Sequence, residues 1–457
     1  MTTKTGLSAL AASVVERALK QGATGAEVIV REEDEFSVNL RKGEVETLKE
    51  SGARGVGLRV FVGQKTASTS SSDLSDEGIE QLVRGAVALA RVSSEDPTAG
   101  MPEAGEMGQL KGAEDGAGLG LFFPDVYSLP TEERIRLARE CERAALDADT
   151  RITNSDGAGF DAGTGHKALA NSRGFVGEYR SSMCSLSAAP IATGEDGEMQ
   201  RDGWWHSSRS LAGLEDAEEI GREAARRTLL RLNARRVPTQ RVPIVFAPEV
   251  ARTLLGHIFE AVNGDAVWRG ASFLAGKLGE AIAASSLTVV NDGTLPGGFG
   301  TAPFDGEGLP TRRTVVIEAG ELKSYLLNTY AAKKLGLRST GNASRGLSGN
   351  PGIGANNLFI AAGSVSPEEI LRRVGTGFYV TGLMGFGVNP VTGDYSRGAT
   401  GLWIERGELS YAVQEVTIAG NLKEMLRGIV AIGNDLIFRS AVASPTLAIE
   451  GMTVAGE

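Results

Sequence analysis

Glycine is the feature that most constrains the fold of this chain. It supplies 61 of the 457 residues, about 13% against a typical share of about 7%. The glycines are dispersed and form no low-complexity repeat. Because glycine lacks a Cβ atom, glycines spread in this way are typical of turns, bulges and close backbone approaches between strands. The sequence therefore predicts a β-rich fold with many turns.

Length, charge and cysteine content exclude several classes of protein. A chain of 457 residues exceeds one ordinary core and predicts two or three domains. The net charge of −10 argues against nucleic-acid binding. The chain contains no apolar run of 18 residues, so we expect no membrane helix. The polar N-terminus does not resemble an export signal. Two cysteines, Cys141 and Cys184, are too few for a disulfide framework, so we expect a reduced, cytoplasmic protein.

Helical and strand-like patterns divide the chain into four segments. Residues 1–95 predict an N-terminal α/β domain with two amphipathic helices and four short strands. Residues 96–130 are rich in glycine, proline and acids, and predict a linker. Residues 131–236 predict a middle α/β domain, and residues 237–457 a β-rich C-terminal domain. The four short strands are expected at 26–31, 35–41, 44–50 and 55–62.

The expected fold class is therefore α+β. An α/β N-terminal half, with a mixed or antiparallel sheet and flanking helices, precedes a β-rich C-terminal domain. In that last domain the helical periodicity predicts helices at 248–262, 367–373 and 422–433.

The segment 385–405 concentrates glycine and polar residues in a turn that leads into a strand. Asp394 can cap a turn and Arg397 can pair with a carboxylate. Ser396 lies outside any Gly-x-Ser-x-Gly pentad, and the glycine spacing is not a dinucleotide fingerprint. A structural turn network is one interpretation, and recognition of a peptide or carboxylate is the other.

A catalytic zinc site is poorly supported by the residues present. Such a site needs about three protein ligands and an open position for water. The chain has three histidines, His166, His206 and His257. His257 and Glu260 are three residues apart on a predicted helix, so these two could share a face. A third ligand is not evident nearby, and the pair remains only an alternative.

Short motifs run through the whole chain in a fixed order. They lie at 50–61, 170–175, 185–188, 272–274, 303–308, 339–343, 389–398 and 418–422. This series resembles the TldD/PmbA family, and specifically its PmbA (TldE) branch. The resemblance implies a cytosolic peptide-processing complex in which a TldD-type subunit holds zinc and a PmbA-type subunit is its partner.

The resemblance also bears on the metal. The TldD branch carries His-Glu-x-x-x-His on a helix and a third ligand, a cysteine, near the C-terminus. With Gly264-Asp265 aligned to that branch, Leu255 and Glu260 fall on the histidine positions and Gly256 on the general-base position. The segment 440–445 contains no cysteine. The resemblance thus implies that this chain has neither catalytic residues nor a cofactor, and that the zinc belongs to the partner.

The function expected from the sequence is that of a PmbA/TldE-like subunit of a cytosolic zinc metallopeptidase complex. The complex would process peptides or unfolded segments, and β-augmentation is one way in which glycine-rich strands bind an extended peptide. Asn389, Asp394, Ser396 and Arg397 are the candidates for a peptide channel or a subunit interface. A homodimer is a further expectation for the isolated chain.

Two alternatives remain open. The first is a stand-alone, divergent metallopeptidase that uses His257 and Glu260. The second is a peptide-binding scaffold without proteolytic activity.

Overall fold

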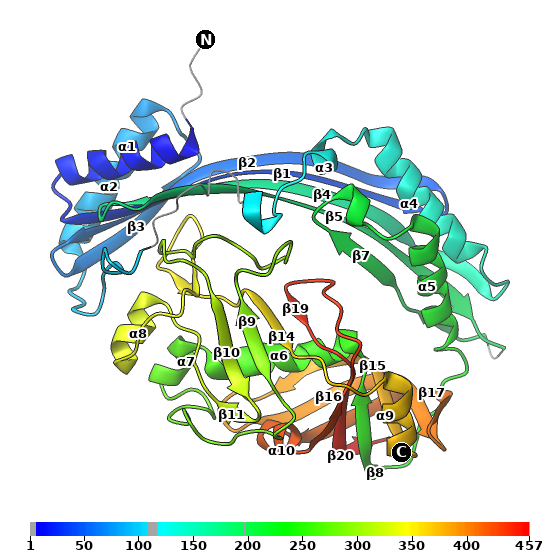
Figure 1. Cartoon of the computed structure of the whole chain (residues 1–457). Helices are drawn as coiled ribbons and strands as arrows, with labels where there is room; N and C mark the ends of the chain where they lie inside the picture. Colours follow the sequence, from blue (N-terminus) through cyan, green and yellow to red (C-terminus); the bar gives the residue numbers. More distant parts are fainter. Residues whose placement is uncertain (1–5, 108–116, 196, 457) are drawn as a thin grey trace.

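A computed structural model describes residues 6–107, 117–195 and 197–456 of the chain. Its N-terminal half is one long, curved antiparallel sheet (Figure 1). The strand order is β3-β2-β1-β4-β5-β6, and β7 also pairs with β5. The bounds are β1 (Gly25–Arg41), β2 (Glu44–Val62), β3 (Lys65–Ser71), β4 (Ile152–Asn171), β5 (Val176–Thr193), β6 (Met199–Arg201) and β7 (Trp204–Ser208).

Two of the central strands, β1 and β2, are much longer than the sequence predicts. The runs expected at 26–31 and 35–41 form one strand, β1, and those at 44–50 and 55–62 form β2. The expectation of short strands is wrong because the polar residues between the runs continue the ladder. Glu32 lies opposite Arg54, and Asp34 lies opposite Gly52. Backbone pairing holds there without an alternating apolar pattern.

Two pairs of helices cover opposite ends of the convex face of this sheet (Figure 1). Val28 and Val30 contact one pair, whereas Phe36 and Val38, on the same face of β1, contact the other. Between the pairs, Glu32 and Asp34 are exposed and lie beside the segment 122–128. The first pair is α1 (Leu7–Lys20) and α2 (Asp76–Val92), and the second is α4 (Thr131–Leu146) and α5 (Ala217–Leu229).

The segment expected to be a linker contains short helices. They are η1 (Ala117–Leu119) and α3 (Asp125–Ser128). Residues 108–116 of that segment lie outside the described residues. A second 3-10 turn, η2 (Leu211–Gly213), precedes α5.

The C-terminal half lies under the concave face of the long sheet (Figure 1). Its larger sheet has the order β17-β16-β15-β8-β20-β18, with β15 and β8 parallel. The bounds are β8 (Gln240–Phe246), β15 (Gly377–Val388), β16 (Asp394–Glu405), β17 (Glu408–Asn421), β18 (Ile429–Ile432) and β20 (Leu447–Ala455).

A second sheet, with the order β11-β10-β9-β14-β19, and a short ribbon complete the β-structure. The sheet consists of β9 (Val289–Asp292), β10 (Arg313–Glu318), β11 (Glu321–Leu322), β14 (Asn357–Ile360) and β19 (Val442–Ala443); the ribbon consists of β12 (Ala343–Ser344) and β13 (Gly352–Ile353). The helices are α6 (Pro248–Val262), α7 (Gly264–Trp268), α8 (Thr329–Leu335), α9 (Pro367–Val374) and α10 (Leu422–Arg427).

The structure confirms the predicted α+β class, with an antiparallel sheet and flanking helices followed by a β-rich part. One predicted helix is wrong in length. The helix expected over 422–433 ends at Arg427, because the chain after Gly428 enters β18 and pairs with β20. No helix among the described residues is both long and apolar enough to cross a membrane.

Candidate functional site

Helix α6 carries the residues that the sequence singles out for metal chemistry. Pro248 occupies its first turn, where the missing N–H costs nothing. Leu255 is fully buried in the core of the C-terminal half, whereas Gly256 and Glu260 are exposed. The position that the resemblance aligns with a ligand histidine is thus a hydrocarbon core residue. The second aligned position, Glu260, lies on the solvent side of the helix.

His257 is half-buried beside Tyr395 of β16. The ring centroids are 6.0 Å apart in an edge-to-face arrangement. His257 Nδ1 lies 3.7 Å from Glu260 Oε2, which exceeds hydrogen-bond length. Burial lowers the pKa of His257, and the Glu260 carboxylate opposes that shift. Burial also raises the pKa of Tyr395 to about 12.

Several polar atoms in this cluster are buried without a hydrogen-bond partner in the described part of the chain. They are both ring nitrogens of His257, the Tyr395 hydroxyl and Nε of Arg397. Unsatisfied buried groups are costly, so such a cluster is a candidate for further contacts.

The geometry does not fit a catalytic zinc ion. His257 and Glu260 supply at most two ligands, and a catalytic site needs about three. Opposite α6, the segment 440–445 offers Ser440, whose Oγ accepts a 3.1 Å hydrogen bond from Arg252. Within the described ranges, no group of three His, Cys, Asp or Glu side chains could hold a metal ion.

The predicted turn network is present at the end of the β15–β16 hairpin. Asn389 Oδ1 accepts hydrogen bonds from the amides of Val391 and Thr392, at 2.9 and 3.2 Å. Asp394 accepts from the Thr392 hydroxyl at 2.6 Å and from Asn421 at 3.2 Å. These bonds hold the pKa of Asp394 below its ordinary value. The turn residues are therefore engaged with one another.

The other two candidates of this segment are separated. Ser396 is exposed on one face of β16. Arg397, on the other face, lies in the cluster of His257 and Tyr395 and contributes to lowering the pKa of the histidine. A peptide or interface role for Asn389, Asp394, Ser396 and Arg397 stays a prediction.

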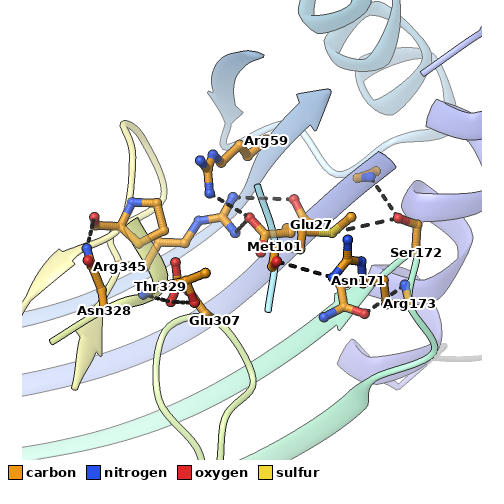
Figure 2. A network of polar contacts seen from close by, with 12 residues as sticks. Glu27, Arg59, Met101, Asn171, Ser172, Arg173, Glu307, Asn328, Thr329 and Arg345 are labelled. Atoms are coloured by element: carbon orange, nitrogen blue, oxygen red, sulfur yellow. Dashed lines mark hydrogen bonds and ion pairs between the residues drawn. The ribbon is translucent and has the colours of Figure 1, made fainter. Parts of the chain in front are cut away.

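A second polar cluster, which sequence reasoning missed, lies at the seam between the long sheet and the C-terminal half. Figure 2 shows Arg59 and Arg345 converging on Glu27. Glu27 Oε2 lies 3.1 Å from Arg59 Nη1 and 3.5 Å from Arg345 Nη1. Arg345 also donates to the Glu27 carbonyl at 3.3 Å, and Arg31 donates to the Arg345 carbonyl at 2.5 Å. All three ion-paired side chains are almost fully buried.

Two carboxylates extend this cluster into the C-terminal half. Glu307 Oε2 accepts from the amide and the hydroxyl of Thr329, at 2.9 and 2.6 Å. Asp305 accepts from the amides of Glu307, Leu309 and Ala343. Burial raises the pKa of Glu307 to about 8 and that of Asp305 to about 6.

The motifs that carry the family resemblance meet at this seam. Phe175 and Phe304 stack edge to face, with centroids 5.1 Å apart. A Cβ on Gly57 would lie 2.1 Å from the Leu347 carbonyl oxygen, so only glycine allows that approach. Four of these motifs, 50–61, 170–175, 303–308 and 339–343, therefore supply residues to one interface within the chain. The ordered motifs were the sequence signal for this interface, but they did not indicate which of their residues are in contact.

The fold defines a class of protein in which one long antiparallel sheet lies over a β-rich half, and that half carries helix α6. Family models of the PmbA/TldA metallopeptidase match the chain in three parts: domain 1 over residues 26–90, the central domain over 124–232 and the C-terminal domain over 239–456.

Curated relatives match nearly the whole chain. The metalloprotease PmbA of Escherichia coli O157:H7 is 41% identical over 433 residues, which cover 95% of this chain and 92% of the relative. A metalloprotease PmbA homolog of Haemophilus influenzae is 35% identical, with coverages of 97% and 94%.

Solved structures agree in fold. A crystal structure from Bacteroides thetaiotaomicron superimposes with a TM-score of 0.90 at 29% identity, covering 98% of both chains. The TldE of Thermococcus kodakarensis gives a TM-score of 0.86 at 22% identity, covering 98% of this chain and all of that one. The chain belongs to the PmbA/TldD family, in its PmbA/TldE branch.

Proposed function

We propose that this chain is the non-catalytic subunit of a cytoplasmic zinc metallopeptidase complex. A TldD-type partner would hold the zinc ion and hydrolyse peptides or unfolded segments. The observation that carries the proposal is the set of residues on α6. Leu255 lies in the core, Gly256 has no side chain, and Glu260 is exposed to solvent. A helix so built lacks both the ligand set and the general base of metal-dependent hydrolysis.

The β15–β16 hairpin supports the proposal that this chain works with a partner or a peptide. Phe386 is 99% exposed, and Met384 and Val391 are at least half exposed. Large apolar side chains grouped on a surface are typical of interaction sites. The turn residues Asn389 and Asp394 hold this hairpin end in shape.

The experiment is to purify the chain alone and together with a TldD-type subunit, and to measure bound zinc and peptide cleavage. We expect zinc and activity only when the partner is present. Stoichiometric zinc and activity in the lone chain, both abolished by His257→Ala, would overturn the proposal in favour of a stand-alone peptidase using His257 and Glu260.

Purification from native cells tests the other alternative. Recovery of a TldD-type subunit supports the complex, whereas its consistent absence supports a peptide-binding scaffold. Sedimentation of the isolated chain will show whether it forms a homodimer.

A further inference from the structure

A cavity of about 110 Å³ lies between the middle segment and the C-terminal half. Trp205 of β7 forms one wall, the first turns of α6 form another, and the segment 435–444 closes it. The cavity is therefore built by three segments that are far apart in the sequence. It is distinct from the cluster of His257 and Tyr395, whose residues do not line it.

Two of the four charged residues around the cavity, Asp435 and Arg439, are bound to neighbouring residues. Asp435 accepts hydrogen bonds from the amide and hydroxyl of Thr446, at 3.0 and 2.7 Å. Arg439 pairs with Glu215 at 3.2 Å. The Glu249 carboxylate acts electrostatically on Arg226 and Tyr379 and helps to raise the pKa of both groups. Asp435 and Arg439 thus hold the walls of the cavity together.

Arg252 differs from the others. Its guanidinium lies over Trp205, 5.4 Å from the ring centroid. Nε donates to the Glu249 carbonyl at 3.1 Å and Nη1 to Ser440 Oγ at 3.1 Å. In the described ranges no carboxylate forms an ion pair with it, so its charge is oriented by three contacts but not neutralised. A planar guanidinium held in this way is suited to a carboxylate.

We infer that this cavity binds the C-terminal carboxylate of a peptide. Arg252 supplies the positive charge for the carboxylate. Trp205 and Ile437, which is 56% exposed, provide apolar walls for the last side chain of the peptide. The cavity is smaller than the dry cavity of about 150 Å³ that admits benzene, so it has room for a carboxylate with only part of one residue.

This inference rests on the proposed function for the class of ligand, because that function makes peptides the substrates and products. Arg252 precedes Gly256 by about one helical turn, or roughly 6 Å along the helix. A peptide anchored at Arg252 would thus have its end held next to the face of α6 that corresponds to the hydrolytic site of the TldD branch.

The test uses the full-length chain alone and measures peptide binding by calorimetry. The probes are an acetylated tripeptide ending in leucine as the free acid, the same peptide as an amide, and an amide that carries an internal aspartate. We expect the free acid to bind at least about tenfold more tightly than either amide. Arg252→Gln should remove that preference, and Arg252→Lys should retain part of it because the charge remains.

Arg269→Gln is the matched control, since Arg269 also lies over a tryptophan, Trp268, at 4.4 Å but outside the cavity. It should leave binding unchanged. Equal binding of the free acid and its amide would overturn the inference, as would unchanged affinity in folded Arg252→Gln. Equal binding of the internal-aspartate amide would refute the assignment to a chain terminus.

If Arg252→Gln does not fold, the comparison of the three peptides on the unmodified chain still tests the inference. Failure of this inference is also distinguishable from failure of the proposed function. No partner and no zinc enter the binding measurement, and neither zinc content nor co-purification depends on the cavity.

Discussion

The two polar clusters of this protein differ in whether their charged side chains form ion pairs. At the seam, Glu27 is ion-paired with Arg59 and Arg345, and all three are closed off from water, although Glu27 Oε1 and both Nε atoms have no hydrogen-bond partner among the described residues. On and around α6, His257 and Arg397 bury nitrogens without hydrogen-bond partners, and Arg252 has no ion-pair partner within the described ranges. Paired charge holds the two halves of the chain together. Unpaired charge next to an opening is available to a ligand or a partner.

The largest expected effect comes from opening the seam. Arg345→Ala leaves Glu27 with one of its two cations and creates a void between the halves. We expect it to lower the free energy of unfolding by about 3–5 kcal/mol, measured by urea denaturation. Arg338→Ala, at an exposed arginine nearby, should change it by less than about 0.5 kcal/mol. A loss below about 1 kcal/mol for Arg345→Ala would show that the paired cluster is not what joins the halves.

Gly57→Ala should act at the same seam without removing a charge. The new Cβ would meet the Leu347 carbonyl at 2.1 Å, and a backbone atom cannot rotate away. We expect a destabilisation of roughly 1–3 kcal/mol from overpacking, seen as a lower urea midpoint. The control is Gly85→Ala, at an exposed position of α2 where a new Cβ would have no atom within 4 Å. Gly43→Ala is not suitable, because Gly43 has a φ of +80° and any side chain there would be strained.

The seam should also make stability depend on pH. Because burial raises the pKa of Glu307, the folded state binds more protons than the unfolded state between about pH 4.5 and 8. Stability conferred by the protonated form is therefore complete at the acidic end of this window and is lost as the pH rises through the folded pKa. One such group changes the free energy of unfolding by at most about 1.4 kcal/mol per pH unit.

Glu307→Gln should flatten that decline, because a neutral amide keeps an acceptor for Thr329 and does not titrate. Urea unfolding at three pH values inside the window will measure it. The exposed Glu318→Gln is the control and should leave the slope unchanged. An identical slope in the Glu307 variant would assign the pH dependence to other groups. Asp305, whose pKa is raised by the same cause, would then be the next to replace.

The smallest effect should have the opposite sign. Gly256 lies in the interior of α6, is exposed, and has open space where a Cβ would be. Gly256→Ala should raise the free energy of unfolding by about 0.5–1 kcal/mol, because alanine loses less backbone entropy in a helix. The measurement is again the urea midpoint. A loss of stability would mean that the bare position on α6 is required by the fold, and would weaken its interpretation as a vacant general-base position.

The sequence predicted what is encoded locally. The helix expected over 248–262 is α6 to the residue, because its apolar positions recur at helical spacing. The long strands were missed where polar residues interrupt the apolar pattern. The seam was not predictable, since Glu27 and Arg345 are separated by 318 residues and neither position has a distinctive local pattern. Arg252 was likewise passed over, because an arginine becomes a binding group only through what the fold places beside it.

The pairing of β1 with β4 also shapes how the chain can fold during its synthesis. β4 begins about 110 residues after β1 ends, which at roughly 5–20 residues per second leaves one edge of β1 open for several seconds. Long, open strand edges attract other chains. The acidic run of Glu32, Glu33, Asp34 and Glu35 lies in the middle of that edge. By repelling the same run on a neighbouring nascent chain, these four carboxylates keep the strand available for its own partner.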